Sequence, residues 1–428
     1  MVEEYETKSK GEIKPKRGAN PRQLQKHQID AISALDNLNK NFSSYSTLIV
    51  LPTGGGKTYT ASNWLLKNAI DKNKKILWLA HRQLLLEQAA ESFQKFAYST
   101  DIQNISSFNY RIISGATSHE RTCNIEPSDN LLIISKESLG RLLNKNQRNN
   151  ENLKKFNAWL DDENEIFLVI DEAHHSTAKT YRKVIDYVKQ RVKNLKLIGL
   201  TATPFRTAES EQGLLSKIFT DGTRDGKSVK NDVGIVYQIG LKDLINRRIL
   251  SVPKFETYYT DLEYGKNLGL DALKSIQNSD KLPSDIAEEI ATGAPRNNLI
   301  VQTYKKKADE YGQTIVFTVS INHAIALTKL FNDAGISAEY VVSNIKDSGT
   351  GVTLSREDNE RKIELFRSGK IKILVNVNIL TEGVDLPMTK TVFLTRPTVS
   401  TILMTQMVGR ALRGPEAKGT EIAYIVSK

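Results

Sequence analysis

The stretch "STLIVLPTGGGKT", Ser46 to Thr58, joins an apolar run to a glycine-rich turn and a lysine. Its end matches most of the phosphate-loop pattern G-x-x-x-x-G-K-[ST], with Gly56, Lys57 and Thr58 in place, but the first glycine of that pattern falls on Leu51. An apolar strand before the turn and the helical stretch "YTASNWLLKNAI" after it are the context that a phosphate loop needs. For this stretch alone, the alternative is a glycine-rich turn with a lysine nearby.

The loop predicts a site for ATP and Mg²⁺. Gly54, Gly55 and Gly56 leave backbone N–H groups free to wrap phosphates, close to a positive helix N-terminus. We expect Lys57 to reach the β- and γ-phosphates and Thr58 to offer its hydroxyl to Mg²⁺.

Short apolar runs alternate with helical patterns along the chain, which predicts an α/β fold with doubly wound parallel sheets. The runs that predict buried strands in the first half are Ser46–Thr53, Lys75–Ala80, Leu131–Ser135, Ile166–Glu172 and Leu195–Thr203. Those in the second half are Thr314–Ser320, Ser337–Ser343, Lys372–Asn378, Thr391–Pro397 and Glu421–Ser427. Helices are predicted over His81–Ala97, Leu241–Leu250 and Asn322–Gly335.

A chain of 428 residues is too long for one ordinary core. We expect one α/β domain over residues 21–252 and a second over 253–428, divided where Pro253 breaks the chain. Residues 1–20 have the composition of a disordered, mixed-charge tail. The segment from Phe205 to Asp232 is predicted to be an excursion or mobile loop.

Composition narrows the class of protein. No apolar run approaches the roughly 20 residues that span a bilayer, and the N-terminus lacks the apolar core of a signal peptide. The single cysteine, Cys123, excludes a disulfide framework and a Cys-rich zinc site, and fits a reducing cytoplasm. The net charge of +11 fits a polyanionic partner such as nucleic acid, or simply a basic protein.

A second apolar run ends in adjacent carboxylates, in "VIDEAHH", Val169 to His175. Ligands of open α/β sheets gather at this end of the strands. We expect Asp171 to hold Mg²⁺ and Glu172 to orient and activate the attacking water. The alternative is an acidic pair that only caps a helix.

The turn "LTATP", Leu200 to Pro204, follows the next apolar run. Small hydroxyl residues such as Thr201 and Thr203 can relay between a nucleotide and a second site. In isolation the same letters form a common strand-to-loop turn.

Two stretches in the second half of the chain have charged residues in positions that suit a binding site. "LTEGVDLP", Leu380 to Pro387, places Glu382, Gly383 and Asp385 on a turn. "QMVGRALRG", Gln406 to Gly414, is predicted to be helical. Its Arg410 and Arg413 would then share one helix face, either to neutralise γ-phosphate charge from across a cleft or as a solvated surface.

The ordered series "LPTGGGKT", "VIDEAHH", "LTATP", "LTEGVDLP" and "QMVGRALR" resembles superfamily 2 helicases and translocases over about residues 21–428. Within them, "LAHRQLLLEQ", "DEAHH" and "VNVNILTEGVDLP" are similar to the DEAD/DEAH-box group of restriction-enzyme motor subunits of types I and III. The resemblance implies two tandem RecA-like domains with an ATP cleft between them. It also makes Leu51 a variant of the phosphate loop rather than a defect, because this position in the superfamily is often small or aliphatic.

The resemblance implies further roles. "LQKHQIDAI" is similar to the adenine-sensing Q motif, with Gln28 on the glutamine and Gln25, Lys26 and His27 departing from the usual residues before it. Asn378 departs from a common aspartate. The implied catalytic residues are Lys57, Asp171, Glu172, Gln406, Arg410 and Arg413. The implied nucleotide-binding residues are Gln28, Pro52, Thr53, Gly54, Gly55, Gly56, Lys57, Thr58, Gly383 and Asp385, with Thr58 and Asp171 on the metal.

Nucleic-acid contacts implied by the resemblance fall on Ala80, His81, Arg82, Ser135 and Thr381. His174, Thr201 and Thr203 would couple the ATP site to the nucleic acid. For His174 and His175, the alternative is a polar loop pair.

These features predict an ATP-dependent helicase or translocase that acts on DNA. An RNA helicase or double-stranded RNA sensor shares the same motor motifs and stays open. A non-catalytic nucleic-acid-binding scaffold is a third hypothesis. The resemblance implies partner subunits that supply nuclease or effector functions in restriction, antiphage defence or repair.

Overall fold

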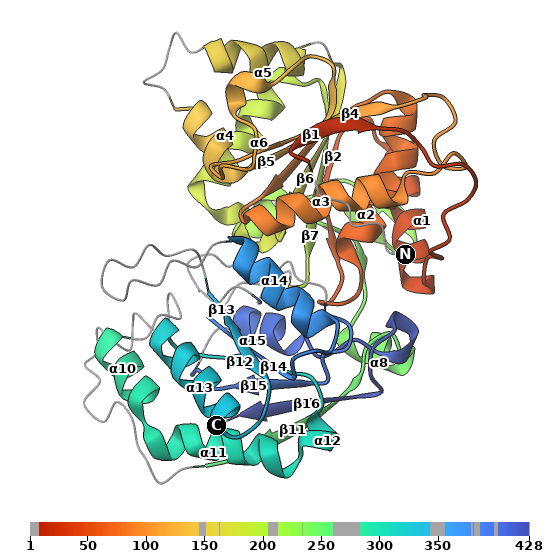
Figure 1. The fold of residues 1–428 in the computed structure, drawn as a ribbon. Helices are drawn as coiled ribbons and strands as arrows, with labels where there is room; N and C mark the ends of the chain where they lie inside the picture. Colours follow the sequence, from red (N-terminus) through yellow and green to blue (C-terminus); the bar gives the residue numbers. More distant parts are fainter. Residues whose placement is uncertain are drawn as a thin grey trace. The chain divides into compact units, whose positions relative to one another are not determined.

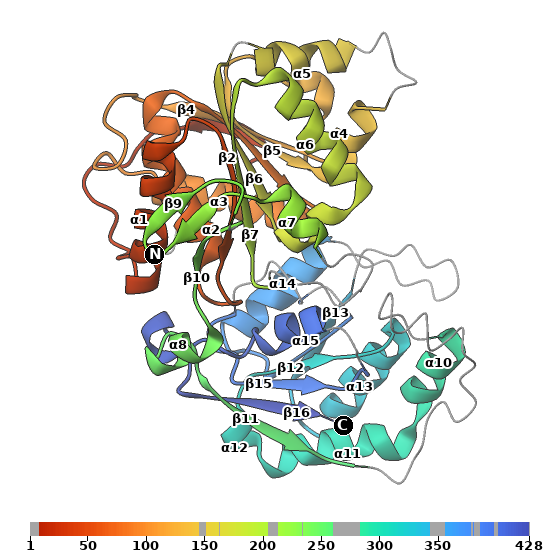
Figure 2. The ribbon, with the colours of Figure 1, turned by 180° about the vertical axis from the view of Figure 1, so that it is seen from behind.

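The computed structural model describes residues 8–144, 151–161, 163–203, 213–232, 234–259, 283–342, 356–377, 380, 386–397 and 401–427. They form two compact units (Figures 1 and 2). The first unit takes in Met1–Pro52 and Gly56–Gly240, and the second takes in Leu241–Lys428 with Thr53–Gly55. No helix among the described residues is long and apolar enough to cross a membrane.

The first unit is built on one mainly parallel sheet. Its strands are β1 (Lys10–Ile13), β2 (Tyr45–Val50), β3 (Lys75–Ala80), β4 (Phe108–Ile113), β5 (Asp129–Ser135), β6 (Glu165–Asp171), β7 (Asn194–Thr201) and β10 (Ile235–Gln238). Within the described residues the order is β1-β4-β5-β3-β6-β7-β2-β10. Every pairing is parallel except that of β1 with β4.

Helices cover both faces of this sheet, as a doubly wound fold requires (Figures 1 and 2). They are α1 (Lys26–Asn41), α2 (Lys57–Asn68), α3 (Gln83–Phe96), α4 (Lys136–Leu142), α5 (Glu151–Asp161), α6 (Lys179–Arg191) and α7 (Leu214–Ile218). Short 3₁₀ turns are η1 (Ile70–Lys72), η2 (Thr122–Asn124) and η3 (Ala173–Thr177), and β8 (Gly222–Arg224) pairs with β9 (Lys227–Val229) as a separate hairpin.

Successive side chains of β3 point to opposite faces of the sheet and pack against helices on both of them. Trp78 packs edge-on against Phe93 of α3, with ring centroids 5.9 Å apart. Leu77 and Leu79 point the other way, into the core cluster that includes Trp159 of α5. Because both faces are buried, the strands are continuous apolar runs, which is why the sequence marks them clearly.

The second unit repeats the plan with a smaller sheet. Its strands are β11 (Val252–Thr257), β12 (Thr314–Phe317), β13 (Ala338–Val341), β14 (Ile373–Asn376), β15 (Thr391–Leu394) and β16 (Ile422–Ser427), in the order β11-β16-β15-β12-β14-β13 and all parallel among the described residues. Its helices are α8 (Leu241–Asn246), α10 (Ser284–Thr292), α11 (Ala294–Lys306), α12 (Ala308–Tyr311), α13 (Ile321–Asp333), α14 (Arg356–Arg367) and α15 (Thr401–Val408), with the 3₁₀ turn η6 (Pro415–Ala417).

One face of the second sheet packs on α11, α12 and α13 through a single apolar cluster. His323 of α13 is fully buried beside it, and its Nε2 lies 3.0 Å from Asn297 Oδ1. Burial, helped by the nearby Arg296 charge, lowers the pKa of His323 to about 3. This histidine is therefore a neutral part of the fold at physiological pH.

The predicted α/β class is confirmed, and the predicted strands and helices are found with shifts at their ends. The prediction of a disordered tail over residues 1–20 is wrong for Lys10–Ile13, which pair with β4. The excursion after Phe205 contains α7 and the β8–β9 hairpin rather than only loop. Strands β4, β10 and β11 were not predicted.

Candidate functional site

Many of the residues predicted for chemistry in the first unit lie along one edge of its sheet. Because β5, β3, β6, β7 and β2 are neighbours in that order and parallel, their carboxyl ends share that edge. The strands end in Ser135, Ala80, Asp171 and Thr201, and β2 leads into the glycine-rich loop at Leu51. Of the predicted residues on this edge, those for the nucleotide follow β6, β7 and β2, and those for nucleic acid follow β5 and β3.

Leu51 anchors the start of the glycine-rich loop. Its side chain is fully buried, and its backbone N–H donates to the Thr201 carbonyl at 3.0 Å. An aliphatic residue at this position extends the strand into the core instead of opening the turn. The turn depends on Gly54 and Gly56, whose φ angles of 89° and 81° lie in the left-handed region that favours glycine.

Gly56 is also held by its neighbourhood. A Cβ on Gly56 would collide with the side-chain amide of Gln28. The Gln28 Oε1 atom accepts a hydrogen bond from the Gln25 N–H at 2.9 Å, which closes a capping box at the start of α1. The start of α1 and the start of α2 are thus brought together, with Gln28 against the loop.

Lys57 and Glu172 face each other across this half of the edge. Lys57 Nζ lies 3.4 Å from Glu172 Oε1, and their side chains are only 11% and 10% exposed. The other carboxylate oxygen, Oε2, lies 3.4 Å from His174 Nδ1, which is itself 3.2 Å from Thr201 Oγ1. Thr201 Oγ1 donates to the Thr203 carbonyl at 2.8 Å and accepts from its N–H at 3.1 Å. Lys57, the acidic pair and the threonine turn are therefore joined in one polar network.

The acidic pair does not cap a regular α-helix. Glu172 has a left-handed backbone with φ 49°, and it precedes the 3₁₀ turn η3. Such strain in a non-glycine residue is common at functional sites. The Asp171 carboxylate is 2% exposed and accepts the Glu172 N–H at 3.0 Å, which fixes its direction at the strand end.

The donor set fits Mg²⁺. Asp171 has a carboxylate at the end of β6 and Thr58 has a hydroxyl in the first turn of α2, which would be the oxygen donors. Mg²⁺ usually binds proteins through one or two such oxygens and takes the rest of its shell from water and phosphate. Within the described part of the chain, no group of three or more His, Cys, Asp or Glu side chains is arranged to hold a metal by itself.

In the other half of the edge, the predicted nucleic-acid residues follow β3 and β5. Ala80 is buried, whereas His81 and Arg82 are half-buried. Ser135 has a structural task as well, because its hydroxyl accepts the Ser138 N–H at 3.2 Å and caps α4. Its side chain therefore has a fixed direction.

The two halves meet at three imidazole rings that are tilted against one another. The His81 and His175 ring centroids are 4.3 Å apart, and those of His175 and His174 are 4.2 Å apart. The sequence pattern did not assign His175 a role. Adjacent histidines after a strand were the available signal, but the partner His81 is distant in sequence.

A further buried trio was not predicted. His119 lies 2.7 Å from Ser114 through Nδ1 and 2.7 Å from Glu87 through Nε2. Although serine, histidine and a carboxylate can form a nucleophilic site, Ser114 is only 2% exposed. The trio instead ties α3 to the loop after β4.

In the second unit, Gln406 lies in α15 and is 5% exposed. The prediction that Arg410 and Arg413 share a helix face is wrong, because α15 ends at Val408. After the end of α15, the Arg413 carbonyl accepts hydrogen bonds from Ser251 Oγ at 2.7 Å and from Thr420 N–H at 2.7 Å. Contacts with distant segments thus replace the next helical turn.

Several predicted residues lie outside the described part of the chain. They are Asn378, Thr381, Glu382, Gly383 and Asp385, together with Pro204 of the threonine turn.

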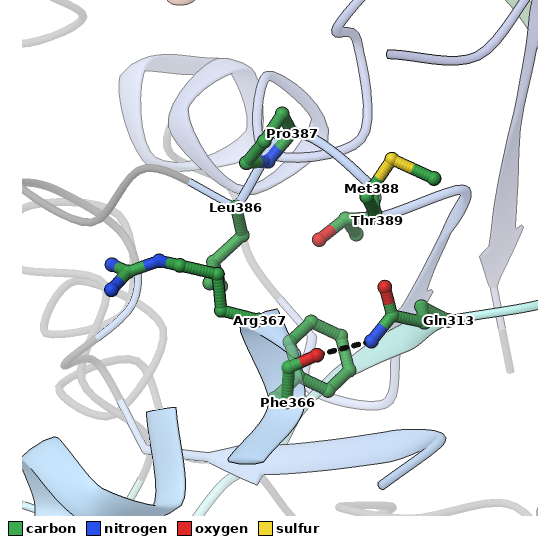
Figure 3. A pocket seen from close by; sticks show the side chains of 7 residues that line it. All are labelled: Gln313, Phe366, Arg367, Leu386, Pro387, Met388 and Thr389. Atoms are coloured by element: carbon green, nitrogen blue, oxygen red, sulfur yellow. Dashed lines mark hydrogen bonds between the residues drawn. The ribbon is translucent and has the colours of Figure 1, made fainter. Parts of the chain in front are cut away.

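A small pocket in the second unit is lined by none of the residues predicted to bind the nucleotide. Figure 3 shows its lining, with the Gln313 side-chain amide donating to the Phe366 carbonyl and the Arg367 guanidinium extending away from Gln313. The rest of the lining is Leu386, Pro387, Met388 and Thr389.

Two protein-family models match different parts of the chain. Residues 20–206 match the model described as type III restriction enzyme, res subunit. Residues 296–415 match the helicase conserved C-terminal domain.

Curated relatives and a solved structure agree with those matches. The chain is 30% identical over 406 residues to the putative ATP-dependent helicase IRC3 of Saccharomyces cerevisiae. That alignment covers 91% of this chain and 49% of the yeast protein. It is 26% identical to the EcoAI type I restriction enzyme endonuclease subunit of Escherichia coli, over 94% of this chain and 45% of that protein. The chain therefore spans about half the length of these curated relatives. A fragment of a putative HsdR subunit of a type I restriction enzyme from Vibrio vulnificus has the same fold, with TM-score 0.58, 20% identity and coverage of 95% of this chain and 65% of that one.

Proposed function

Because the chain belongs to the superfamily 2 helicases related to the motor subunits of type I and type III restriction enzymes, we propose that it hydrolyses ATP to move along DNA. The observation that carries the proposal is the meeting of Lys57 and Glu172 at the sheet edge, 3.4 Å apart and mostly buried. A buried lysine beside a carboxylate at the start of a helix suits phosphate binding followed by attack of water.

In this proposal the glycine-rich loop binds the phosphates through its backbone N–H groups, and Lys57 neutralises their charge. Gln28 recognises the adenine, since its side chain already lies against the loop at Gly56. Glu172 orients and deprotonates the attacking water. Mg²⁺, held by Asp171 and Thr58, would supply further positive charge to the phosphates.

We assign the remaining predicted residues from the family resemblance. Pro52, Thr53, Gly383 and Asp385 complete the nucleotide-binding set. Gln406, Arg410 and Arg413 belong to the catalytic set, where an arginine that neutralises γ-phosphate charge contributes roughly 10³–10⁵-fold in rate.

The proposed nucleic-acid track uses Ala80, His81, Arg82, Ser135 and Thr381. Backbone amides and hydroxyls at such positions bind phosphates without reading the bases. We therefore expect sequence-independent binding that weakens steeply with salt. The overall charge of +11 is consistent with such a partner.

DNA is the proposed substrate because the relatives include subunits of restriction enzymes. An RNA helicase is the second candidate, since the motor motifs are shared. The test is steady-state ATP hydrolysis by the full chain with single-stranded DNA, duplex DNA, RNA or no nucleic acid. Stimulation by DNA above that by RNA supports the proposal. Stimulation by RNA alone favours the second candidate, and absence of any ATP turnover supports the scaffold.

We also propose that the motor works with separate subunits that supply a nuclease or effector in restriction, antiphage defence or repair. The support is the likeness to one subunit of a multi-subunit class of restriction enzyme. Co-purification of the full chain with products of neighbouring genes tests this. Recovery of the chain alone under gentle lysis would count against it.

A further inference from the structure

The two functional halves of the first sheet edge meet between β3 and β6. These strands pair in parallel, with Leu79 opposite Ile170, so the residues that follow each strand lie next to each other. His81 follows β3 in the nucleic-acid half, and His174 and His175 follow β6 in the ATP half. The ends of these two strands are therefore a place where the halves are in direct contact.

Three imidazole rings fill this junction. His175 contacts His81 with ring centroids 4.3 Å apart and contacts His174 with ring centroids 4.2 Å apart, so it is the middle ring. His174 is 1% exposed, and its Nδ1 lies 3.2 Å from Thr201 Oγ1 and 3.4 Å from Glu172 Oε2. The three tilted rings therefore connect His81, a proposed nucleic-acid contact, with the proposed catalytic carboxylate of Glu172.

We propose that His175 is a positioning residue that couples nucleic-acid binding to ATP hydrolysis by linking the His81 ring to His174. The inference rests on the proposed function and deepens it, because it names a route by which nucleic acid changes the rate of hydrolysis. It differs from the assigned roles of His81 and His174, since the His175 ring contacts both of theirs.

The physical argument is that closely packed rings transmit displacement instead of absorbing it. When a phosphate backbone settles against residues 80–82, the His81 ring takes up one position relative to the strand end. His175 must follow, and His174 then changes the direction in which the Glu172 carboxylate is held. A modest change in that direction is enough, because a base acts only at hydrogen-bond distance from its water.

A purely structural role makes a different prediction. If the His175 ring only fills space in η3, its loss would lower stability and would reduce ATP hydrolysis equally with and without nucleic acid. The ratio of the two rates therefore separates coupling from packing. Allosteric coupling usually changes such a ratio by about 5- to 150-fold.

The test compares the full chain with its His175→Ala and His175→Phe variants. The control is Lys179→Ala, which alters an exposed side chain shortly after the same turn. For each protein, kcat is measured with no nucleic acid and with saturating concentrations of whichever nucleic acid stimulates the unaltered chain most. The affinity for that nucleic acid is measured separately by fluorescence anisotropy.

We expect His175→Ala to lower the stimulation ratio by about 5-fold or more while the unstimulated kcat and the nucleic-acid affinity stay close to those of the unaltered chain. His175→Phe, which keeps an aromatic ring, should recover most of the stimulation. A His175→Ala variant stimulated as strongly as the unaltered chain overturns the inference alone. Equal loss of both rates also overturns it, in favour of packing. An unaltered chain that hydrolyses ATP without any stimulation overturns the proposed function itself.

Discussion

Lys57 Nζ and Glu172 Oε1 lie 3.4 Å apart at the carboxyl edge of the first sheet, although 114 residues separate them along the chain. The two side chains are 11% and 10% exposed, so water screens their attraction less than at an open surface. A phosphate that enters the glycine-rich loop would compete with Glu172 for the ammonium group. Such an exchange would release the carboxylate to orient water, which links nucleotide binding to assembly of the base.

The first prediction concerns the charge of Lys57. Lys57→Ala should reduce ATP hydrolysis in the presence of nucleic acid by at least about 10²-fold, because one preorganised charge on the phosphates is lost. Steady-state phosphate release measures the effect. The matched control is Lys67→Ala, which removes an exposed lysine from the last turn of the same helix. Normal activity of Lys57→Ala would contradict the placement of the phosphates.

The second prediction concerns the crowding around Gly56. Gly56→Ala should weaken ATP binding, because the added methyl group meets the Gln28 amide and the residue must hold φ 81°. The backbone alone should cost about 1–2 kcal/mol of stability. Isothermal titration with a non-hydrolysable ATP analogue measures the loss of affinity, and thermal unfolding measures the strain.

Gly18 offers a control for that substitution. It has a similar φ of 89°, but a Cβ there would meet nothing within 4 Å. Gly18→Ala should therefore show the backbone cost without a loss of nucleotide affinity. Equal affinity losses in both variants would mean that contact between Gln28 and the loop is not what shapes the site.

Much of the first unit was predictable because its strands are buried on both faces. Runs such as Lys75–Ala80 are entirely apolar apart from their first residue, and β3 has those bounds. The motif residues follow such strands, so their meeting at one edge was predictable from the rule for parallel sheets. The meeting of Lys57 with Glu172 follows from the same rule.

The features that sequence reasoning missed depend on distant partners. Lys10–Ile13 form a strand only because β4 offers an edge to pair with, and the mixed-charge composition around them gave no sign of it. Arg413 leaves the helical pattern because its carbonyl accepts hydrogen bonds from Ser251 and Thr420. Local propensity cannot reveal either contact, since both partners are far away in the chain.

The third prediction is a pH dependence of stability in the second unit. Burial lowers the pKa of His323 to about 3, against 6.5 for the unperturbed side chain. Between these values the unfolded chain binds a proton that the folded chain does not, so stability rises with pH. This contribution is fully present above about pH 6.5 and is lost as pH falls toward 3, by about 1.4 kcal/mol per pH unit.

Urea unfolding of the full chain and of His323→Gln at a series of pH values measures that slope. All three tryptophans, Trp64, Trp78 and Trp159, lie in the first unit, so their fluorescence separates its transition from the circular dichroism of the whole chain. The variant should be less stable at pH 7 but should have a shallower slope below pH 6.5. Identical slopes would mean that His323 is protonated inside the fold.

The central claim is that Glu172 acts as the base for ATP hydrolysis. The most direct test is a paired measurement on Glu172→Gln: affinity for ATP, and the rate of hydrolysis with saturating nucleic acid. The control is Glu151→Gln, at a side chain that is 75% exposed on α5. We expect ATP affinity to be unchanged or higher, since Lys57 loses its competing carboxylate, while the rate falls by about 10²–10⁴-fold. Hydrolysis by Glu172→Gln at the rate of the unaltered chain would contradict the claim.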